Sequence, residues 1–539
     1  MADRTGTDAP ARIGAVAPSS LDGERFDLVV VGGGITGAGV ARHAAQCGLS
    51  TLLLESADFA AGTSSRSTKL IHGGLRYLAM GEIALVREAA LERKSLLAMA
   101  PHLTEPRWML VPAHSRLQFW KLRLGIGLYE RLGAVPAAER HRNCRGGELA
   151  DVEPLLDRER LRYACRYREY LTDDARLVLA TLRAAAADGA VACNHVRVTG
   201  VTPQGDGARV AAVDLRSGGE FGVNAGCVVN AAGPWVESLL PADGGDRSAP
   251  RLHLSKGVHL VVERARLPVR NMVMMTAEDG RPVFAIARGG VTYVGTTDTS
   301  HAGGPEHWPE VTADDIAYLL RAVAGHFPAA GIGERDIVAS WAGLRPLINQ
   351  PGKAAREMSR RDEIWRHGPL VTVAGGKLTG FRKMAEEAMG AVGEVLGREL
   401  SMPRPLAPVA GGELTDVAAW TEELGRRYQL DARQASRLVR LYGAEAPAVL
   451  GGQPAPLTPS TFAEEVDWAV DVEGARTLED VIYRRLRAAW FLPDELEQAV
   501  DRVAARMAGK LGWDAATTDA EIRAVQSRLA DELAFRPHP

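Results

Sequence analysis

Residues 26–55 read FDLVVVGGGITGAGVARHAAQCGLSTLLLE, and this stretch decides the fold of the chain. Leu28–Val31 is a short apolar run of the kind found in buried parallel strands. A glycine turn follows, then a helix-compatible segment that ends at Cys47, and then a second apolar strand at Thr51–Leu54. A strand, a turn, a helix and a strand within about thirty residues predict an α/β domain that binds a dinucleotide.

The glycine turn has the residues that a dinucleotide requires around its phosphates. Gly32 permits the sharp turn, Gly34 lets a pyrophosphate approach the backbone, and Gly37 lets the helix pack close to the strand. The helix N-terminus offers N–H groups to the diphosphate, and Glu55 can accept hydrogen bonds from the adenosine ribose. The predicted cofactor contacts here are Gly32, Gly34, Ile35, Thr36, Gly37 and Glu55.

Length and composition fit a globular chain with a large core. The 539 residues suggest two or three domains, and 46% of them are hydrophobic. A net charge of −3 gives no reason to expect nucleic-acid binding. The five cysteines are scattered without a C-x-x-C pair, which argues against a disulfide framework or a metal site and fits a reducing cytoplasm.

The sequence predicts no membrane-spanning segment, because no run of 18 apolar residues exists. Residues 1–24 are polar and lack the apolar stretch of a signal peptide, so we expect a disordered tail. Residues 84–131 are expected to be helical. One face there combines apolar and basic side chains, which allows either peripheral attachment to an anionic membrane or packing on its own domain. The residues concerned are Leu117, Trp120, Leu124 and Leu128 beside Arg116, Lys121, Arg123 and Arg131.

A segment rich in small hydroxyl residues, AAGTSSRSTK at 60–69, follows the glycine turn and its second strand. Such residues can hydrogen-bond a flavin and its phosphates, although a solvated loop would have the same composition. The chain continues as LIHGGLRYL at 70–78. The predicted flavin contacts in this segment are Thr63, Ser64, Ser65, Ser67, Lys69 and Leu70.

The run SSRSTKLIHGGLRYL at 64–78 resembles the signature of FAD-dependent glycerol-3-phosphate dehydrogenases of the aerobic, respiratory type. That family belongs to the larger glycine and D-amino-acid oxidase group. Four later segments resemble the same family: VVNAAGPW at 228–235, GTTDT at 295–299, GLRPL at 343–347 and AGGKLT at 374–379. The resemblance extends from residue 26 to about 390, and 464–490 is similar to the helical appendage of the family.

The resemblance implies a two-domain flavoprotein of the D-amino-acid oxidase type. A Rossmann-like FAD domain (segments about 25–100, 170–245 and 340–400) would interleave with an antiparallel-sheet substrate domain (about 101–169 and 246–339). An all-α domain would follow at 403–539. Strands are expected at 258–263, 281–287 and 291–296, and helices at about 312–326 and 381–396. Further implied FAD contacts are Val196, Ala232, Gly233, Trp235, Gly375, Gly376, Lys377, Leu378 and Thr379.

The implied reaction is oxidation of sn-glycerol 3-phosphate to dihydroxyacetone phosphate by hydride transfer to FAD, with electrons passed to a respiratory quinone. Arginine suits the phosphate because its planar fork binds two oxygens. Arg76 and Arg345 are the expected phosphate ligands, with Tyr77 and His72 beside them. His259 is the expected general base, His72 is the alternative, and Arg345 would also stabilise the alkoxide. Lys377 would place a charge near the flavin or the substrate.

Three other functions stay open on the sequence alone. A glycerol-3-phosphate oxidase that uses O2 and releases H2O2 would have the same motifs. An amine or amino-acid oxidase fits the flavin segments but not two phosphate-binding arginines. A flavin-binding protein without catalysis is the third. The expected partners of a dehydrogenase are a quinone, the inner face of the cell membrane and a second copy of the chain in a homodimer.

Overall fold

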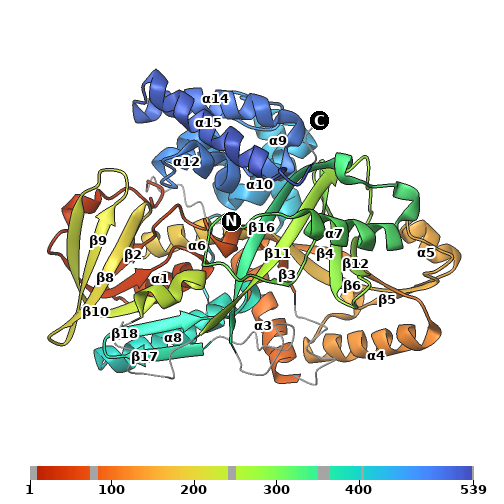
Figure 1. Ribbon diagram of the computed structural model, residues 1–539, viewed down its shortest axis with the longest axis horizontal. Coiled ribbons are helices and arrows are strands. Elements are labelled where there is room, and N and C mark those ends of the chain that lie inside the picture. Colours follow the sequence, from red (N-terminus) through yellow and green to blue (C-terminus); the bar gives the residue numbers. More distant parts are fainter. Residues whose placement is uncertain (1–8, 73–82, 241–250, 350–362, 402–405, 537–539) are drawn as a thin grey trace.

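The computed structural model describes residues 9–72, 83–240, 251–349, 363–401 and 406–536. Two β-sheets lie side by side, and a helical domain covers one end of both (Figure 1). This arrangement agrees with the predicted architecture, a Rossmann-like α/β part beside a mostly antiparallel sheet, with an all-α C-terminal domain.

The first sheet is built on the fingerprint stretch. Its parallel strands follow the order β18–β10–β1–β2–β7, with β17 antiparallel at one edge and the hairpin β8–β9 continuing from β10. The strands are β1 (Arg25–Val31), β2 (Thr51–Leu54), β7 (Val191–Cys193), β8 (Val196–Gln204), β9 (Gly207–Asp214), β10 (Glu220–Asn230), β17 (Glu363–His367) and β18 (Leu370–Ala374).

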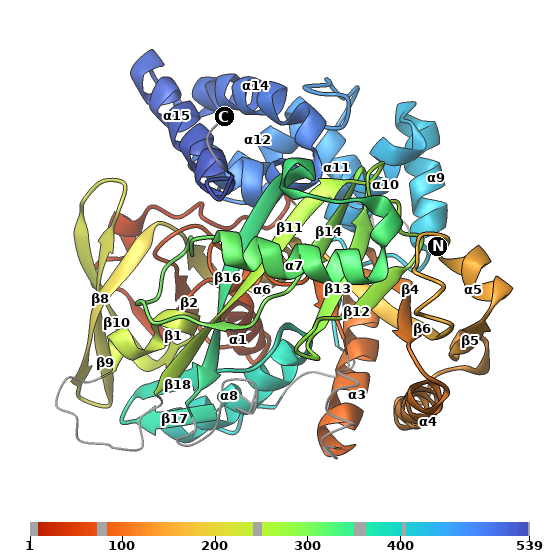
Figure 2. The same ribbon diagram turned by 45° about the vertical axis from the view of Figure 1, so that its right-hand side comes forward.

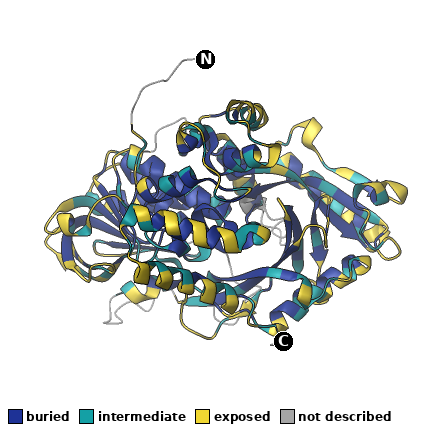
Figure 3. Ribbon diagram, turned by 90° about the horizontal axis from the view of Figure 1, so that it is seen from above, coloured by how far each residue is buried: buried dark blue, intermediate teal, exposed yellow. Residues whose placement is uncertain are grey.

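Both faces of this sheet are covered, which explains why β1 is apolar without alternation. Leu28 and Val30 pack against the helices α1 (Ile35–Gln46), α6 (Asp174–Ala187) and α8 (Phe381–Leu396). Val29 and Val31 belong to the core on the β8–β9 side. Figure 3 shows the strands dark blue in the interior, with exposed residues on the outer faces of the helices.

The second sheet is antiparallel except where β4 and β12 run parallel. Its order is β15–β11–β14–β13–β12–β4–β6–β3, with β16 also paired to β11 and β5 to β6. The strands are β3 (Leu70–Ile71), β4 (Thr104–Ala113), β5 (Arg142–Arg145), β6 (Tyr163–Thr172), β11 (Leu252–Glu263), β12 (Met272–Thr276), β13 (Pro282–Arg288), β14 (Val291–Gly295), β15 (Thr299–Ser300) and β16 (Ile337–Ile348).

Helix α7 (Ala313–His326) lies across the outer face of the second sheet, over β11, β13 and β14 (Figure 2). The helices α3 (Ile83–Met99) and α4 (Arg116–Leu132) and the short helix α5 (Gly147–Val152) lie around β4–β6. The expected strands near 258–263, 281–287 and 291–296 and the helices near 312–326 and 381–396 are confirmed. Strands β3 and β16 belong to this second sheet. The sequence predicted β3 and most of β16 within the FAD domain, in its segments 25–100 and 340–400.

The C-terminal region is helical, as expected. Its helices are α9 (Val417–Tyr428), α10 (Ala432–Tyr442), α11 (Ala446–Leu450), α12 (Ala463–Asp471), α13 (Ala488–Phe491), α14 (Leu496–Leu511) and α15 (Ala515–Asp531). Trp490 and Phe491 of α13 pack on Trp341 of β16. The helical domain therefore shares an apolar core with the second sheet.

Two local expectations differ from the structure. The stretch 84–131 is not helical throughout, because β4 pairs with β6 over its full length between α3 and α4. The N-terminal segment is ordered from at least Ile13, whose side chain is buried and whose N–H donates to the carbonyl of Val472 at 3.0 Å. A contact with the distant helical domain holds this segment, and local composition carries no sign of it.

Candidate cofactor and substrate site

The glycine turn adopts the geometry that its residue types require. Gly32 has φ of +112°, which favours glycine. A Cβ on Gly37 would lie 1.9 Å from the carbonyl oxygen of Gly32, so a side chain there would force α1 away from β1. Gly34 caps α1 without a side-chain hydrogen bond, and the Ile35 N–H donates to Ser64 Oγ at 3.0 Å. The hydroxyl segment thus lies directly at the N-terminus of the helix.

Glu55 is held at the carboxyl end of β2. Its carboxylate accepts the N–H groups of Gly33 at 2.6 Å and Ala57 at 2.7 Å. Burial raises the pKa of Glu55 above its ordinary value. The Val196 N–H donates to the Glu55 carbonyl at 2.8 Å, so these two predicted cofactor residues are neighbours.

The later flavin segments converge on the same edge of the first sheet, because the carboxyl ends of its parallel strands meet there. Ala232, Gly233 and Trp235 follow β10, and residues 375–379 follow β18. A Cβ on Gly233 would meet no atom within 4 Å among the described residues, so open space lies in front of it. Thr379 Oγ1 donates to the His72 carbonyl at 3.4 Å, which joins this edge to the end of β3.

The segment 63–70 lies between the two sheets. Thr63 Oγ1 donates to the Leu344 carbonyl at 2.5 Å, and the Ser67 hydroxyl donates to Asp174 at 2.8 Å. Lys69 is fully buried and forms an ion pair with Asp174 at 3.1 Å. Burial lowers the pKa of Lys69 to about 7, although Asp174 opposes the shift. The Ser67 and Lys69 side chains therefore contact protein.

His259 projects from β11 against this segment. Its Nε2 lies 3.0 Å from Thr68 Oγ1, and its ring stacks on Trp341 of the neighbouring strand with centroids 4.8 Å apart. Burial, together with the charges of Lys69 and Arg345, holds the pKa of His259 well below 6.5, so the ring is neutral at pH 7. The buried Nδ1 has no hydrogen-bond partner among the described residues.

Arg345 of β16 lies on the same face of the sheet, since its register places it opposite Ser255, four residues before His259. Its guanidinium donates to Thr296 Oγ1 at 2.8 Å and to the Thr297 carbonyl at 3.1 Å, and it pairs with Asp298 at 3.3 Å. These contacts hold the Arg345 guanidinium in place on the face of the sheet from which the His259 imidazole also projects.

Two glycines make room for these side chains. A Cβ on Gly257 would lie 2.3 Å from Arg345 Nη2, and a Cβ on Gly295 would lie 2.0 Å from His259 Cδ2. Real Cβ atoms do not approach other atoms so closely, so any larger residue at either position would displace the side chain that rests on it. Sequence reasoning quoted Gly295 within GTTDT but assigned no role to either glycine.

The remaining predicted residues are only partly described. His72 is half-buried at the end of β3, and Lys377 precedes the short helical turn Leu378–Gly380 that leads into α8. Arg76 and Tyr77 lie outside the described residues. Thr68, Trp341 and Asp174 contact the predicted site residues and were missed, because their partners are distant in sequence.

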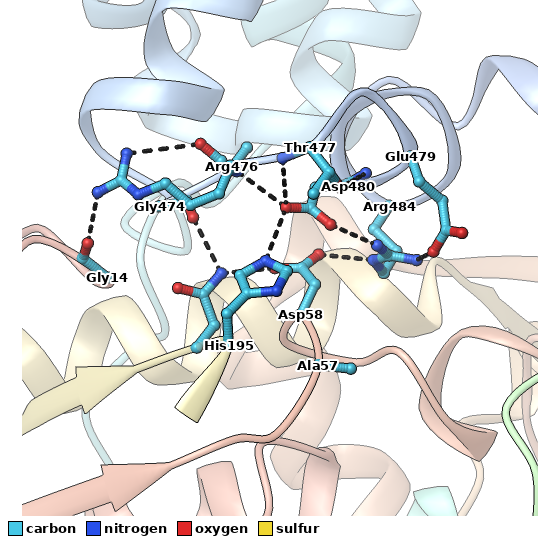
Figure 4. A network of polar contacts seen from close by, with 12 residues as sticks. Gly14, Ala57, Asp58, His195, Gly474, Arg476, Thr477, Glu479, Asp480 and Arg484 are labelled. Atoms are coloured by element: carbon cyan, nitrogen blue, oxygen red, sulfur yellow. Dashed lines mark hydrogen bonds and ion pairs between the residues drawn. The ribbon is translucent and has the colours of Figure 1, made fainter. Parts of the chain in front are cut away.

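Among the described residues, Asp58, His195 and Asp480 present carboxylate and imidazole atoms within 4.8 Å of one another. Guanidinium groups already occupy the space around these carboxylates. Arg484 Nε donates to Asp58 at 2.5 Å, and Arg484 Nη2 donates to Asp480 at 2.7 Å (Figure 4). The cluster is an ion-pair network rather than a cation site.

Comparison with known proteins agrees with this geometry. Residues 27–381 match the family model of FAD dependent oxidoreductases, and residues 406–518 match that of the C-terminal domain of alpha-glycerophosphate oxidase. The chain is 37% identical to the aerobic glycerol-3-phosphate dehydrogenase of Staphylococcus haemolyticus over 92% of this chain and 93% of that one. It is 38% identical to the Bacillus subtilis enzyme of the same name over 91% and 92% of the two chains.

Solved structures give the same result. The glycerol-3-phosphate dehydrogenase from Bacillus halodurans complexed with FAD superposes with a TM-score of 0.79 at 32% identity, over 97% of this chain and 98% of that one. The chain therefore belongs to the FAD dependent oxidoreductases. Within them it is a member of the family of aerobic glycerol-3-phosphate dehydrogenases, which it matches over both the flavin and the helical parts.

FAD fits the residues present. The helix N-terminus at Gly34 carries no side chain, Glu55 is fixed at the ribose position of the fingerprint, and open space lies before Gly233. These features suit a diphosphate, a ribose and a close backbone approach, respectively.

Proposed function

We propose that this enzyme oxidises sn-glycerol 3-phosphate to dihydroxyacetone phosphate and passes the electrons to a respiratory quinone. The observation that carries the proposal is the pair His259 and Arg345, a neutral base and a fixed guanidinium on one face of the second sheet, against the flavin segment. The names of the similar enzymes favour the same substrate.

In this proposal His259 removes the proton of the middle hydroxyl. Its neutral imidazole can accept at Nδ1 while Nε2–H donates to Thr68 Oγ1, which holds the ring in one tautomer. Arg345 stabilises the oxygen that loses the proton and contributes to phosphate binding. Bound FAD supplies the acceptor for two electrons.

The other predicted residues keep their proposed roles. Arg76, Tyr77 and His72 bind the phosphate, and Lys377 adds a positive charge beside the flavin or the substrate. The proposed FAD contacts are those from the glycine turn, the 63–70 segment, Val196, the residues after β10 and residues 375–379. His72 remains the alternative base, and its position at the end of β3 keeps it near the flavin segment.

Stopped-flow absorbance of the flavin tests the function directly. Anaerobic mixing with glycerol 3-phosphate is expected to bleach the oxidised flavin, and a soluble quinone, but not air-saturated buffer, is expected to restore it rapidly. Rapid restoration by oxygen with stoichiometric H2O2 would identify an oxidase instead. Absence of bleaching would refute the substrate and leave an FAD-binding chain with another role.

We further propose that α4 attaches the enzyme to the inner face of the membrane. Leu117, Trp120, Leu124 and Leu128 form one stripe on α4 and are 67%, 46%, 70% and 44% exposed. The opposite face of α4 is buried against the protein through Phe119 and Ile126, so the exposed stripe does not serve packing among the residues that the structure describes.

The charges around the stripe suit an anionic lipid surface. Lys121 and Arg131 flank it at helical spacing, and Glu130, the single acid of α4, lies on the buried side and pairs with His141. Among the described residues no helix has the length and apolar character needed to cross a membrane. Helix α4 lies at the edge of the molecule opposite the helical domain (Figure 1).

Trp120→Glu combined with Leu124→Glu should abolish most vesicle binding. The double change places two charges where apolar side chains would insert, and each such side chain contributes about 1.5–3 kcal/mol when fully buried. Flotation with vesicles of anionic lipid is expected to show at least a tenfold loss of the bound fraction, with unchanged flavin reduction in solution. Leu215→Glu, at another exposed leucine, is the matched control.

Equal flotation of the wild type and the double variant would contradict attachment by α4. If the double variant instead changes from dimer to monomer in sedimentation, the stripe is an interface between copies of the chain, which would fit the proposed homodimer and not the membrane.

A further inference from the structure

Three arginines close together in sequence reach out of the helical domain into the flavin part of the molecule. Arg484 and Arg485 end the π-helical turn Asp480–Arg485, and Arg487, two residues after Arg485, has φ of +60°. Their exposed fractions are 2%, 0% and 2%. Buried guanidinium groups require anionic partners. The positions of these partners therefore show which segments of the flavin part the three arginines keep in place.

The first partner is Asp58, three residues after Glu55. Arg484 Nε donates to its carboxylate at 2.5 Å (Figure 4). Arg485 Nη2 donates to the same carboxylate at 3.0 Å and Asn194 Nδ2 at 2.9 Å. A backbone hydrogen bond also joins this loop to the start of β8, because the His195 N–H donates to the Ala57 carbonyl at 2.8 Å. Arg484 and Arg485 therefore fix the loop on which Glu55 and Val196 stand.

The second partners are Asp173 and Asp174 at the start of α6. Arg487 Nε donates to Asp173 at 3.1 Å, and Arg487 Nη2 donates to Asp174 at 2.9 Å. Asp174 also accepts the Ser67 hydroxyl at 2.8 Å and forms the ion pair with Lys69 at 3.1 Å. The carboxylate of Asp174 thus links Arg487 to the predicted flavin segment 63–70. This segment carries Thr68, which contacts His259.

Both links join buried arginines to buried aspartates. Three guanidinium groups face the carboxylates of Asp58, Asp173 and Asp174, all of which are buried. If the helical domain moved away, Asp58 would lose both of its arginine partners, and Asp173 and Asp174 would keep only Arg288 of the second sheet and Lys69. The loops that these carboxylates hold would then have to rearrange. The positions of both nucleotide-binding loops therefore depend on the domain after residue 403.

We propose that Arg485 and Arg487 are positioning residues for FAD, and that the helical domain is a structural part of the cofactor site. Arg485 sets the loop at the ribose end through Asp58, and Arg487 sets the loop at the flavin end through Asp174. Neither side chain needs to touch the cofactor. The inference concerns cofactor binding, so it stands whether or not glycerol 3-phosphate is the substrate.

The test compares Arg487→Met with Arg183→Met. Arg183 of α6 is also buried and also pairs across to the helical domain, through Glu445, but its partner contacts neither nucleotide-binding loop. Apo-protein is titrated with FAD and the flavin fluorescence and visible absorption band are followed, while the melting temperature of each apo-variant is recorded.

We expect Arg487→Met to raise the dissociation constant of FAD at least thirtyfold and to alter the visible band, and Arg183→Met to lower the melting temperature with less than a threefold change in FAD binding. Arg487→Lys keeps the charge and loses one arm of the fork, so it should recover at least half of the lost affinity on a logarithmic scale. It also keeps the test decisive if the methionine variant does not fold. Equal FAD affinity in the Arg487 and Arg183 variants would overturn the proposal.

Discussion

His259→Gln should lower kcat for glycerol 3-phosphate by about 10²–10⁴-fold while FAD stays bound, the range that general-base catalysis contributes. Glutamine can reach Thr68 Oγ1 as Nε2 does, but its amide accepts no proton at neutral pH. The expected result is therefore slow flavin reduction with little change in the spectrum of the bound flavin. Stopped-flow reduction under anaerobic conditions measures it without interference from the electron acceptor.

The pH dependence has a definite sign. Burial and the charges of Lys69 and Arg345 hold the pKa of His259 well below 6.5, so the neutral, base-competent form persists as the pH falls through 6.5. The acidic limb of kcat/KM for the wild type should lie well below pH 6.5 and should disappear in His259→Gln. A loss of reduction in His72→Gln, with His259→Gln unaffected, would assign the base to His72.

Local patterns predicted those parts of the fold whose partners are close in sequence. The apolar run Leu28–Val31, the glycine turn and the second apolar run predicted the end of β1, the end of α1 to within one residue and the whole of β2, because the fingerprint specifies strand, turn and helix together. The same reasoning missed β4. Its apolar core Trp108–Val111 lies between two helices, and pairing with β6, more than fifty residues away, decides its conformation.

In the site, too, contacts between residues that are distant in sequence could not be predicted. His259 and Arg345 could be named from motifs, but their shared face depends on the register between β11 and β16. The side chain of Lys69, a predicted flavin contact, pairs with Asp174, 105 residues later. Arg487 reaches the same carboxylate across 313 residues. Such contacts follow from how the sheets and the helical domain pack, and no local pattern encodes them.

Gly257→Ala tests the geometry of the site without replacing a side chain that acts on the substrate. The new Cβ would lie 2.3 Å from Arg345 Nη2 and 2.7 Å from Thr296 Oγ1. The guanidinium is the end of a flexible side chain, so it can move at small cost in stability, and the fold and the bound FAD should survive. The hydrogen bonds that fix Arg345 would be lost or distorted, and bonds to charged groups contribute about 1.5–3 kcal/mol each.

We therefore expect Gly257→Ala to lower kcat/KM for glycerol 3-phosphate by about 10–100-fold, since each 1.36 kcal/mol corresponds to a factor of ten. The melting temperature should stay close to that of the wild type. Gly290→Ala is the matched control, because its Cβ would meet the nearest atom, Arg433 Nη2, at an ordinary 3.7 Å. Wild-type kcat/KM in Gly257→Ala would mean that the guanidinium of Arg345 does not need its place beside Thr296 for catalysis, and the role proposed for this arginine would fail.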